Sequence, residues 1–500
     1  MISSNKEKAV TGVYWMGLMS ISNIIIKLLI IMILSRLIAP YEFGIVAAIQ
    51  IVISFAEVFW MMGIGPAIVQ KKELSNEDIA TGNTLNIIFG ISIFIIIYFL
   101  SPIIIKFIGI ENVNMLRVLS LLFVISSLSG VSEALLQREM NFKPLSLINI
   151  ISLFIYGFLG SFLAFLDFGA WALIIAQLVQ VSVKTILTLV QKPVEFKLKI
   201  EKKSVKSLLS FGMGFTISRI FNTLANQGDY LVINKTLGST ALGFYNRSYQ
   251  VLLVPTIVIG TVMDKVLFPL LSKYQNENEK MSYVYLNITA LMSIIAFPIT
   301  TLVLIMGEEL IYVLLGSNWS AAVLPLKILI ISLFARMAYK ICDSLINSIG
   351  KVYRRVWTQI FYAFTVIFGA YVGKDWGING VAVAVTIAIT LNYIIMNILV
   401  MRLINLKLRD LLRYLIPIFI ISILIGLISY WLSTIVAMLH LEILRLVIMT
   451  IVIGVLYLFT FKYVIFKLMP GAFNEFARII VTTLAKKILP KRIQKRILNL

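Results

Sequence analysis

Long apolar runs separated by short polar loops are the dominant pattern of the chain. Each run holds about 20 mostly apolar residues, the length that an α-helix needs to cross the hydrocarbon core of a bilayer. The pattern predicts an all-α polytopic membrane protein. Its expected spanning helices, about fourteen in number, lie near residues 12–34, 43–65, 83–106, 114–136, 145–167, 170–191, 208–233, 243–270, 283–306, 323–348, 356–374, 377–400, 412–437 and 442–468.

Basic residues are distributed unevenly between the loops. The chain has 44 Lys and Arg residues. The large majority of those that lie outside the spans are in alternate loops and in the two terminal segments. Positive charge accumulates on the cytoplasmic side of membrane proteins. We therefore expect both termini in the cytoplasm. The net charge of +21 does not indicate nucleic-acid binding, because the basic residues are scattered between apolar runs.

The composition excludes several other classes of protein. With 60% apolar and 13% charged residues, the chain cannot cover a soluble surface with polar groups. One cysteine, Cys342, cannot form a disulfide scaffold, and with the single His440 it cannot supply a zinc site. The sequence has no P-loop for a nucleotide. We expect a protein without metal, cofactor or catalytic residue, which is not an enzyme.

Two halves of the chain resemble each other. Residues 34–44 match residues 233–243 at an offset of 199, which places Arg36 on Lys235 and Gly44 on Gly243. Each half holds an even number of spans, so the halves form parallel repeats around a central cavity. The predicted divisions are an N-terminal six-helix lobe (1–191), a basic cytoplasmic linker (192–207), a C-terminal six-helix lobe (208–400), two extra helices (401–469) and a basic amphipathic tail (470–500).

Polar residues inside the spans follow helical spacing and identify candidate site residues. Ser20, Asn23 and Lys27 share one face of a helix, and the repeat places Arg219, Asn222 and Asn226 on the equivalent face. Ionisable groups inside spans usually face a cavity. The candidate substrate-binding residues are Asn23, Lys27, Arg219, Asn222, Asn226, Arg247, Arg336 and Lys340.

Carboxylates inside the spans are candidates for coupling to a proton or cation gradient. A buried carboxyl group can take up and release a proton as its surroundings change. We expect Glu57, Glu133 and Asp229 to serve in this way. Structural explanations compete: Lys184 can extend to the cytoplasmic interface, Asp264 can pair with Lys265, and an ion-pair cluster can join the charged residues of span 10, Arg336, Lys340 and Asp343.

Several segments resemble one protein family. These are Leu34–Gly44, Ala67–Gln70, Leu135–Phe142, Gly228–Tyr230 and Leu237–Tyr245. They resemble the corresponding segments of Wzx-type polysaccharide flippases of the MOP (multidrug/oligosaccharidyl-lipid/polysaccharide) superfamily, and within it the branch of colanic-acid and teichuronic-acid exporters. The resemblance implies two six-helix lobes arranged as a V around a cavity.

The resemblance also implies a function. Proteins of this kind move an undecaprenyl-pyrophosphate-linked oligosaccharide from the inner to the outer leaflet of the bacterial inner membrane. Lys27, Arg219 or Arg247 could hold the pyrophosphate through charge-assisted hydrogen bonds. The expected partners are this glycan and membrane lipids, and they could include a polysaccharide polymerase and a chain-length regulator.

Two alternative functions remain open at this stage. A drug or metabolite antiporter of the same superfamily would share the lobes and differ in its cavity. A polytopic polysaccharide polymerase would need a sizeable outer loop with catalytic acids. The expected outer loops are short, and Glu308-Glu309 is their only adjacent acid pair.

Overall fold

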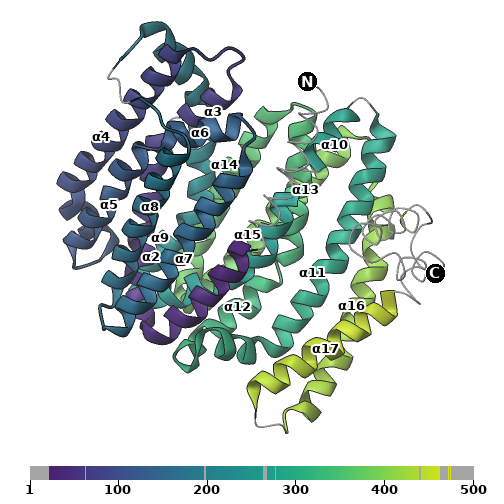
Figure 1. The fold of residues 1–500 in the computed structure, drawn as a ribbon. Coiled ribbons are helices and arrows are strands. Elements are labelled where there is room, and N and C mark those ends of the chain that lie inside the picture. Colours follow the sequence, from purple (N-terminus) through teal and green to yellow (C-terminus); the bar gives the residue numbers. More distant parts are fainter. Residues whose placement is uncertain are drawn as a thin grey trace, which may run out of the picture. The chain divides into compact units, whose positions relative to one another are not determined.

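Helices make up every regular element in the part of the chain that the structure describes (Figure 1). The computed structural model describes residues 22–61, 63–195, 199–262, 267–275, 277–438, 441–461, 471 and 473. The helices are residues 22–37, α2 (Pro40–Met61), α3 (Ile64–Gln70), α4 (Asn76–Ile108), α5 (Val113–Ser127), α6 (Gly130–Arg138), α7 (Phe142–Phe165), α8 (Ala170–Gln191), α9 (Lys202–Val262), α10 (Phe268–Lys273), α11 (Asn278–Leu315), η2 (Ser317–Ala322), α12 (Val323–Ile330), α13 (Leu333–Ser348), α14 (Val352–Gly373), η3 (Lys374–Trp376), α15 (Gly377–Leu403), α16 (Leu408–Val436) and α17 (Glu442–Thr460).

The predicted class, an all-α polytopic membrane protein, is confirmed. Within the described ranges, eight helices are long and apolar enough to cross a membrane, and up to ten if each of two bent pairs is one span. The bends measure 46° between α5 and α6 and 48° between Ser317–Ile330 and α13. The number fourteen stays a prediction. One expected pair of spans lies in α9, whose 61 residues are broken at Gly238 (φ 85°, ψ 172°).

The chain divides into two compact units. The first unit contains residues 1–258, 311–329 and 356–388, and the second contains residues 259–310, 330–355 and 389–500. These divisions differ from the lobe boundaries expected from the sequence, so the two-lobe organisation stays a prediction. Ser20, Asp264, Lys265 and the basic tail, apart from Gly471 and Phe473, lie outside the described residues.

In the first unit, α4, α5 and α8 lie side by side (Figure 1). Their apolar side chains fill the interior, and Leu116 and Phe123 of α5 are fully buried. At Gly157 of α7 the closest neighbour is Ile30, and the absence of a side chain there lets the two helices approach closely. The opposite face of α7 is exposed and apolar, as expected for contact with lipid; its phenylalanines are Phe154, Phe158, Phe162 and Phe165.

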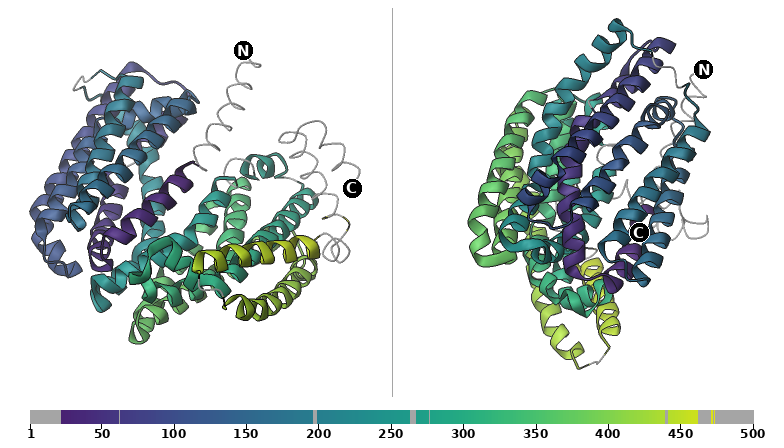
Figure 2. Two further views of the ribbon diagram at one scale, coloured as in Figure 1. Left: turned by 60° about the horizontal axis from the view of Figure 1, so that its bottom comes forward. Right: turned by 90° about the vertical axis from the view of Figure 1, so that its left-hand side faces the viewer.

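In the second unit, aromatic and polar contacts join helices that are distant in sequence. The ring of Phe297 in α11 lies 5.4 Å from that of Phe334 in α13 and 5.8 Å from that of Phe419 in α16. Helices α16 and α17 lie together in both views of Figure 2. The hydroxyl groups of Thr301 and Tyr457 are 3.0 Å apart and link α11 to α17.

Candidate functional site

A polar cavity of the first unit lies between residues 24–34, α2, α7, α8 and α9. Its volume is about 510 Å³, and we call it the Arg247 cavity. The described residues that line it include two cations and no carboxylate. Its polar lining consists of Lys27, Gln50, Tyr156, Gln177, Gln180, Asn246, Arg247 and Gln250. An acid-free cavity of this kind has the chemistry to take an anion that also carries hydroxyl groups.

Arg247 is a buried cation whose only described side-chain partners are uncharged. It is 6% exposed, and its guanidinium carbon lies 3.8 Å from the ring centroid of Phe43. Its Nη1 donates to Oε1 of Gln250 over 2.5 Å, while Nε has no hydrogen-bond partner among the residues that the structure describes. Burying a charge without an opposite charge is costly. A bound anion would supply the missing partner, and the guanidinium could hold a phosphate group through two bonds.

The amide side chains that line the Arg247 cavity form hydrogen bonds with one another, one between α8 and α2 and one along α9. Gln177 Nε2 donates to Gln50 Oε1 over 3.3 Å, and Gln250 Nε2 donates to Asn246 Oδ1 over 2.8 Å. An amide both donates and accepts hydrogen bonds, so it can replace water around a sugar hydroxyl. Sequence reasoning did not select Tyr156, Gln177, Gln180 or Asn246 as site residues. The spacing of Gln177 and Gln180 inside an expected span was the available signal.

A second cavity of about 370 Å³ lies in the same unit, and we call it the Arg219 cavity. Two ion pairs cross its wall: Arg219 Nη2 lies 3.8 Å from Glu57 Oε1, and Lys184 Nζ lies 2.9 Å from Glu133 Oε2. A carboxylate on α6 thus pairs with the Lys184 ammonium group, and the extension of Lys184 to the membrane interface stays a prediction. The other polar lining residues are Trp60, Asn86, Ser126, Ser129, Gln137 and Thr185.

The three carboxylates expected to couple transport to a gradient do not lie together. Glu57 and Glu133 both line the Arg219 cavity and are paired with cations. Asp229 is elsewhere on α9 and is 2% exposed. Its carboxylate accepts hydrogen bonds from the Tyr245 hydroxyl over 2.8 Å and from the Tyr230 backbone over 2.9 Å. Among the described residues, no group of three His, Cys, Asp or Glu side chains could hold a metal.

The remaining candidate residues lie outside both cavities. Asn23 is half-buried on residues 22–37. On α9, Asn226 donates to Oδ1 of Asn222 over 2.6 Å. Arg336 and Lys340 belong to the second unit. Arg336 Nε donates to Ser332 Oγ over 3.0 Å, and the Lys340 ammonium lies 6.0 Å from the ring of Tyr339. The predicted roles of these five residues stay predictions.

At one end of α2, two glycines that occupy equivalent positions of the repeat make reciprocal contacts. A Cβ atom on Gly44 would collide with the carbonyl oxygen of Ser239, and one on Gly243 would collide with that of Pro40. The offset of 199 that pairs the two glycines also pairs Pro40 with Ser239. The backbones can approach this closely only because both positions lack a side chain.

Further contacts surround the two glycines with the same reciprocity. Each of the paired residues Arg36 and Lys235 contacts the end of the third helix of the other half: Arg36 Nη2 donates to the Val313 carbonyl over 2.9 Å, and the Lys235 ammonium lies 4.3 Å from the Phe107 ring. Their preceding residues also engage that region. Trp319 Nε1 donates to the Ser35 carbonyl over 2.7 Å, and Asn234 donates to the Ile108 carbonyl. We call these contacts, with the glycine pair, the clasp.

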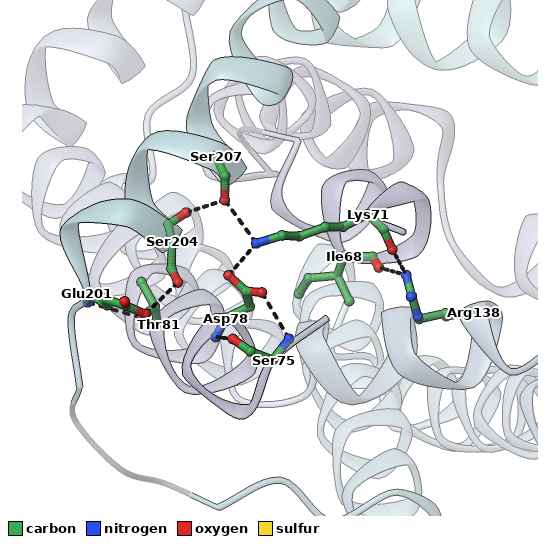
Figure 3. A network of polar contacts seen from close by, with 9 residues as sticks. All are labelled: Ile68, Lys71, Ser75, Asp78, Thr81, Arg138, Glu201, Ser204 and Ser207. Atoms are coloured by element: carbon green, nitrogen blue, oxygen red, sulfur yellow. Dashed lines mark hydrogen bonds and ion pairs between the residues drawn. The ribbon is translucent and has the colours of Figure 1, made fainter. Parts of the chain in front are cut away.

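The other end of α2 leads to a network of charged side chains around Arg138 (Figure 3). Arg138 at the end of α6 donates to the carbonyls that end α3, over 2.7 Å to Ile68 and 2.5 Å to Lys71. The Lys71 ammonium lies 2.6 Å from Asp78 of α4 and donates to Ser207 of α9 over 3.3 Å. We call this cluster the Arg138 network. It attaches the start of α9 to α3, α4 and α6.

Two known proteins of similar sequence are named for the biosynthesis of teichuronic acid and of lipopolysaccharide. The chain is 27% identical to the Bacillus subtilis (strain 168) teichuronic acid biosynthesis protein TuaB over 65% of this chain and 68% of that protein. It is 26% identical to the Escherichia coli (strain K12) lipopolysaccharide biosynthesis protein WzxC over 79% of this chain and 80% of that protein.

Solved structures of two transporter types share the fold. The lipid II flippase MurJ in an inward closed conformation matches with a TM-score of 0.72 and 16% identity, over 90% of this chain and 99% of that chain. An inward-facing multidrug resistance MATE family transporter of the MOP superfamily matches with a TM-score of 0.63 and 16% identity, over 78% and 99%. Residues 33–324, more than half of the chain, match the family described as "Polysaccharide biosynthesis protein", and the chain belongs to that family.

Proposed function

We propose that this protein moves an undecaprenyl-pyrophosphate-linked oligosaccharide from the inner to the outer leaflet of the bacterial cytoplasmic membrane. The observation that carries the proposal is the buried Arg247, which faces a cavity lined by amides and a second cation, Lys27, with no carboxylate among its described lining. A pyrophosphate is the anion that a lipid-linked sugar presents at this point. Relatives named for polysaccharide biosynthesis and transport support the same substrate class.

Each part of such a substrate has a suitable environment. The pyrophosphate would bind between the guanidinium of Arg247 and the ammonium of Lys27. The sugar hydroxyls would exchange water for the amides of Gln50, Gln177 and Gln250, because a glycan is too polar to cross hydrocarbon unaided. The isoprenoid tail would remain in the bilayer.

We propose that the coupling site lies in the Arg219 cavity. Its ion pairs, Glu57 with Arg219 and Glu133 with Lys184, can separate when a proton or cation takes the place of the basic partner. Asp229 is a third candidate, held by Tyr245. If collapsing both the proton and the sodium gradients left transport in inverted vesicles unchanged, cation coupling would be wrong. The multidrug antiporter alternative is less suited to the Arg247 cavity, since organic cations need a carboxylate that its described lining lacks.

Deleting the gene tests the substrate class directly. We expect the lipid-linked repeat unit of a surface polysaccharide to accumulate on the inner leaflet. The proposal also places both termini in the cytoplasm. It further includes a polysaccharide polymerase and a chain-length regulator as partners. If no lipid-linked saccharide accumulates and polymer still reaches the surface, the proposed function fails.

Replacing Arg247 tests the binding site. We expect Arg247→Met to weaken binding of undecaprenyl pyrophosphate in nanodiscs at least about tenfold, which corresponds to about 1.4 kcal/mol. The melting temperature should stay the same or rise, because the variant removes a buried charge that has no carboxylate partner. Arg117→Met is the matched control: Arg117 also stacks on an aromatic ring, Tyr98 at 4.6 Å, and lines neither cavity. Equal affinity in both variants would remove Arg247 from the site.

A further inference from the structure

We propose that the clasp is a closure that opens when an anion binds in the Arg247 cavity, and that Phe43 and Trp319 transmit the binding event. This inference rests on the proposed function, since it takes the pyrophosphate group as the ligand. It goes further by assigning the cavity a direct mechanical connection to a contact between the two repeated halves.

A continuous series of contacts runs from the cavity to the clasp. The Arg247 guanidinium covers the face of Phe43, which also lines the cavity. The Phe43 ring meets the Trp319 ring edge-on, with centroids 5.5 Å apart and an interplanar angle of 62°. Trp319 in turn donates to the Ser35 carbonyl within the clasp. Two side chains, Arg247 and Phe43, therefore separate the candidate ligand from Trp319 of the clasp.

The surroundings of Trp319 tie it to both halves of the chain. Phe244 of α9 packs against its second side with centroids 5.8 Å apart. Ser248, the residue after Arg247, donates to the Ala322 carbonyl of the same short helix η2 over 2.7 Å. Trp319 has no exposed surface, so a shift of Phe43 or of α9 cannot leave its position unchanged.

The physical basis is a competition for one guanidinium. In the absence of a ligand, Arg247 compensates part of its charge with the π-face of Phe43 and the oxygen of Gln250. A phosphate oxygen offers a stronger, charge-assisted bond and draws the guanidinium toward the cavity. Phe43 then loses the cation that covers it, and its packing against Trp319 is no longer fixed.

The reciprocity of the clasp makes its opening cooperative. Gly44, Gly243 and their partners Ser239 and Pro40 belong to one mutual contact, so neither half of it can separate alone. A disturbance at Trp319 therefore favours a second arrangement of the whole clasp over a local adjustment, because such close-packed contacts are bistable.

The test measures the distance across the clasp with and without inorganic pyrophosphate. Tyr41 and Thr240 are exposed, occupy equivalent positions of the repeat and flank the glycine contact. Spin labels at Tyr41→Cys and Thr240→Cys, in a Cys342→Ser background in nanodiscs, report this distance. We expect pyrophosphate to lower the short-distance population at least twofold. A Tyr41→Cys and Glu111→Cys pair, both within the first half, should show no change.

A substitution of Trp319 tests the transmission. Trp319→Phe keeps a ring but removes the hydrogen bond to Ser35, so we expect a long-distance population before pyrophosphate is added. Pyrophosphate affinity should be equal to or higher than that of the unsubstituted protein, because a ligand that opens the clasp binds the open form more tightly. Trp376→Phe, at a tryptophan that is 71% exposed, is the control and should behave like the unsubstituted protein.

The outcomes separate the inference from the proposed function. Pyrophosphate that binds by calorimetry without changing the distance overturns the closure and leaves the binding site intact. A Trp319→Phe variant that responds like the unsubstituted protein also overturns it. No binding of pyrophosphate overturns both the closure and the assignment of Arg247 to the headgroup.

Discussion

The clasp and the Arg138 network lie at the two ends of α2, and each joins segments that resemble the flippase family. The clasp brings Leu34–Gly44 against Leu237–Tyr245, which are about 200 residues apart. The Arg138 network brings Ala67–Gln70 against Leu135–Phe142 within the first half of the chain. The segments that resemble the flippase family therefore form one contact between the two halves and one contact within the first half.

The chemistry of the two regions differs in a way that indicates their roles. The Arg138 network depends on an arginine that donates to several carbonyls and on a lysine–carboxylate pair, which are strong and geometrically demanding bonds. The clasp depends on close backbone packing and on aromatic contacts. The first suits a permanent attachment of α9. The second suits surfaces that separate and meet again, since no buried ion pair has to be broken among its described contacts.

Substituting a clasp glycine should have the largest effect on transport. Gly44→Ala places a methyl group against the Ser239 carbonyl, so the closed arrangement cannot form without a backbone shift. We expect export of the polysaccharide in a complementation assay to fall at least about tenfold, or about 1.4 kcal/mol. Gly243→Ala should have the same effect. The double variant should be no worse than either single one, because both remove the same contact.

A glycine outside the clasp provides the control for this effect. A methyl group at Gly454 of α17 would meet nothing within 4 Å, so Gly454→Ala should export normally. If Gly454→Ala lost as much activity as Gly44→Ala, the loss would not depend on the clasp. Thermal unfolding of each purified variant distinguishes a failure to fold from a failure to close.

Replacing Arg138 should lower stability more than any substitution in the clasp and should not shift the Tyr41–Thr240 distance. In Arg138→Lys, a single ammonium group cannot replace both guanidinium nitrogens, of which Nη1 donates to the Ile68 carbonyl and Nη2 to the Lys72 carbonyl. We expect the free energy of unfolding to fall by about 2–3 kcal/mol, which is the contribution of a hydrogen bond made by a charged group. Arg117→Lys, which alters a half-buried arginine that donates to Ser101, should lose less than half of that. If Arg138→Lys changed the Tyr41–Thr240 distance and left the free energy of unfolding unchanged, the Arg138 network would not be a permanent attachment.

The sequence predicted the all-helical membrane class and a set of candidate residues, but not which side chains these residues contact. Apolar runs and mid-span charges identified Lys27 and Arg247 as candidate residues, and both line one cavity. The repeat placed Gly44 on Gly243, a pairing that the reciprocal contact matches. Ile108 and Val313 lie at the end of the third helix of each half, and Trp319 comes shortly after Val313 in the sequence. No periodicity points to such residues, because their position depends on how distant helices pack.

Tertiary packing also explains why residues that share a predicted helix face line different cavities. Lys27 and Arg219 share the predicted polar face of the repeat, yet they line different cavities. Helical spacing gives the face of a residue, whereas the neighbour across that face is set by tertiary packing. Lys184 likewise pairs with Glu133 of α6, a partner that helical spacing alone does not identify.

The smallest effect is expected at an exposed ion pair of Glu139, the residue that follows Arg138 in the sequence. Lys192 Nζ lies 2.5 Å from Glu139 Oε1, and both side chains are substantially exposed, at 33% and 47%. Water and salt screen such a pair, so Lys192→Ala should change the free energy of unfolding by less than about 1 kcal/mol. Asp78 is only 4% exposed, and Asp78→Ala should cost more, because it leaves Lys71 without its carboxylate and removes one of the two hydrogen bonds of the capping box of α4. Equal losses in chemical denaturation would mean that the Lys71–Asp78 pair is screened as strongly as the exposed pair, and the role of the Arg138 network as a permanent attachment would then rest on Arg138 alone.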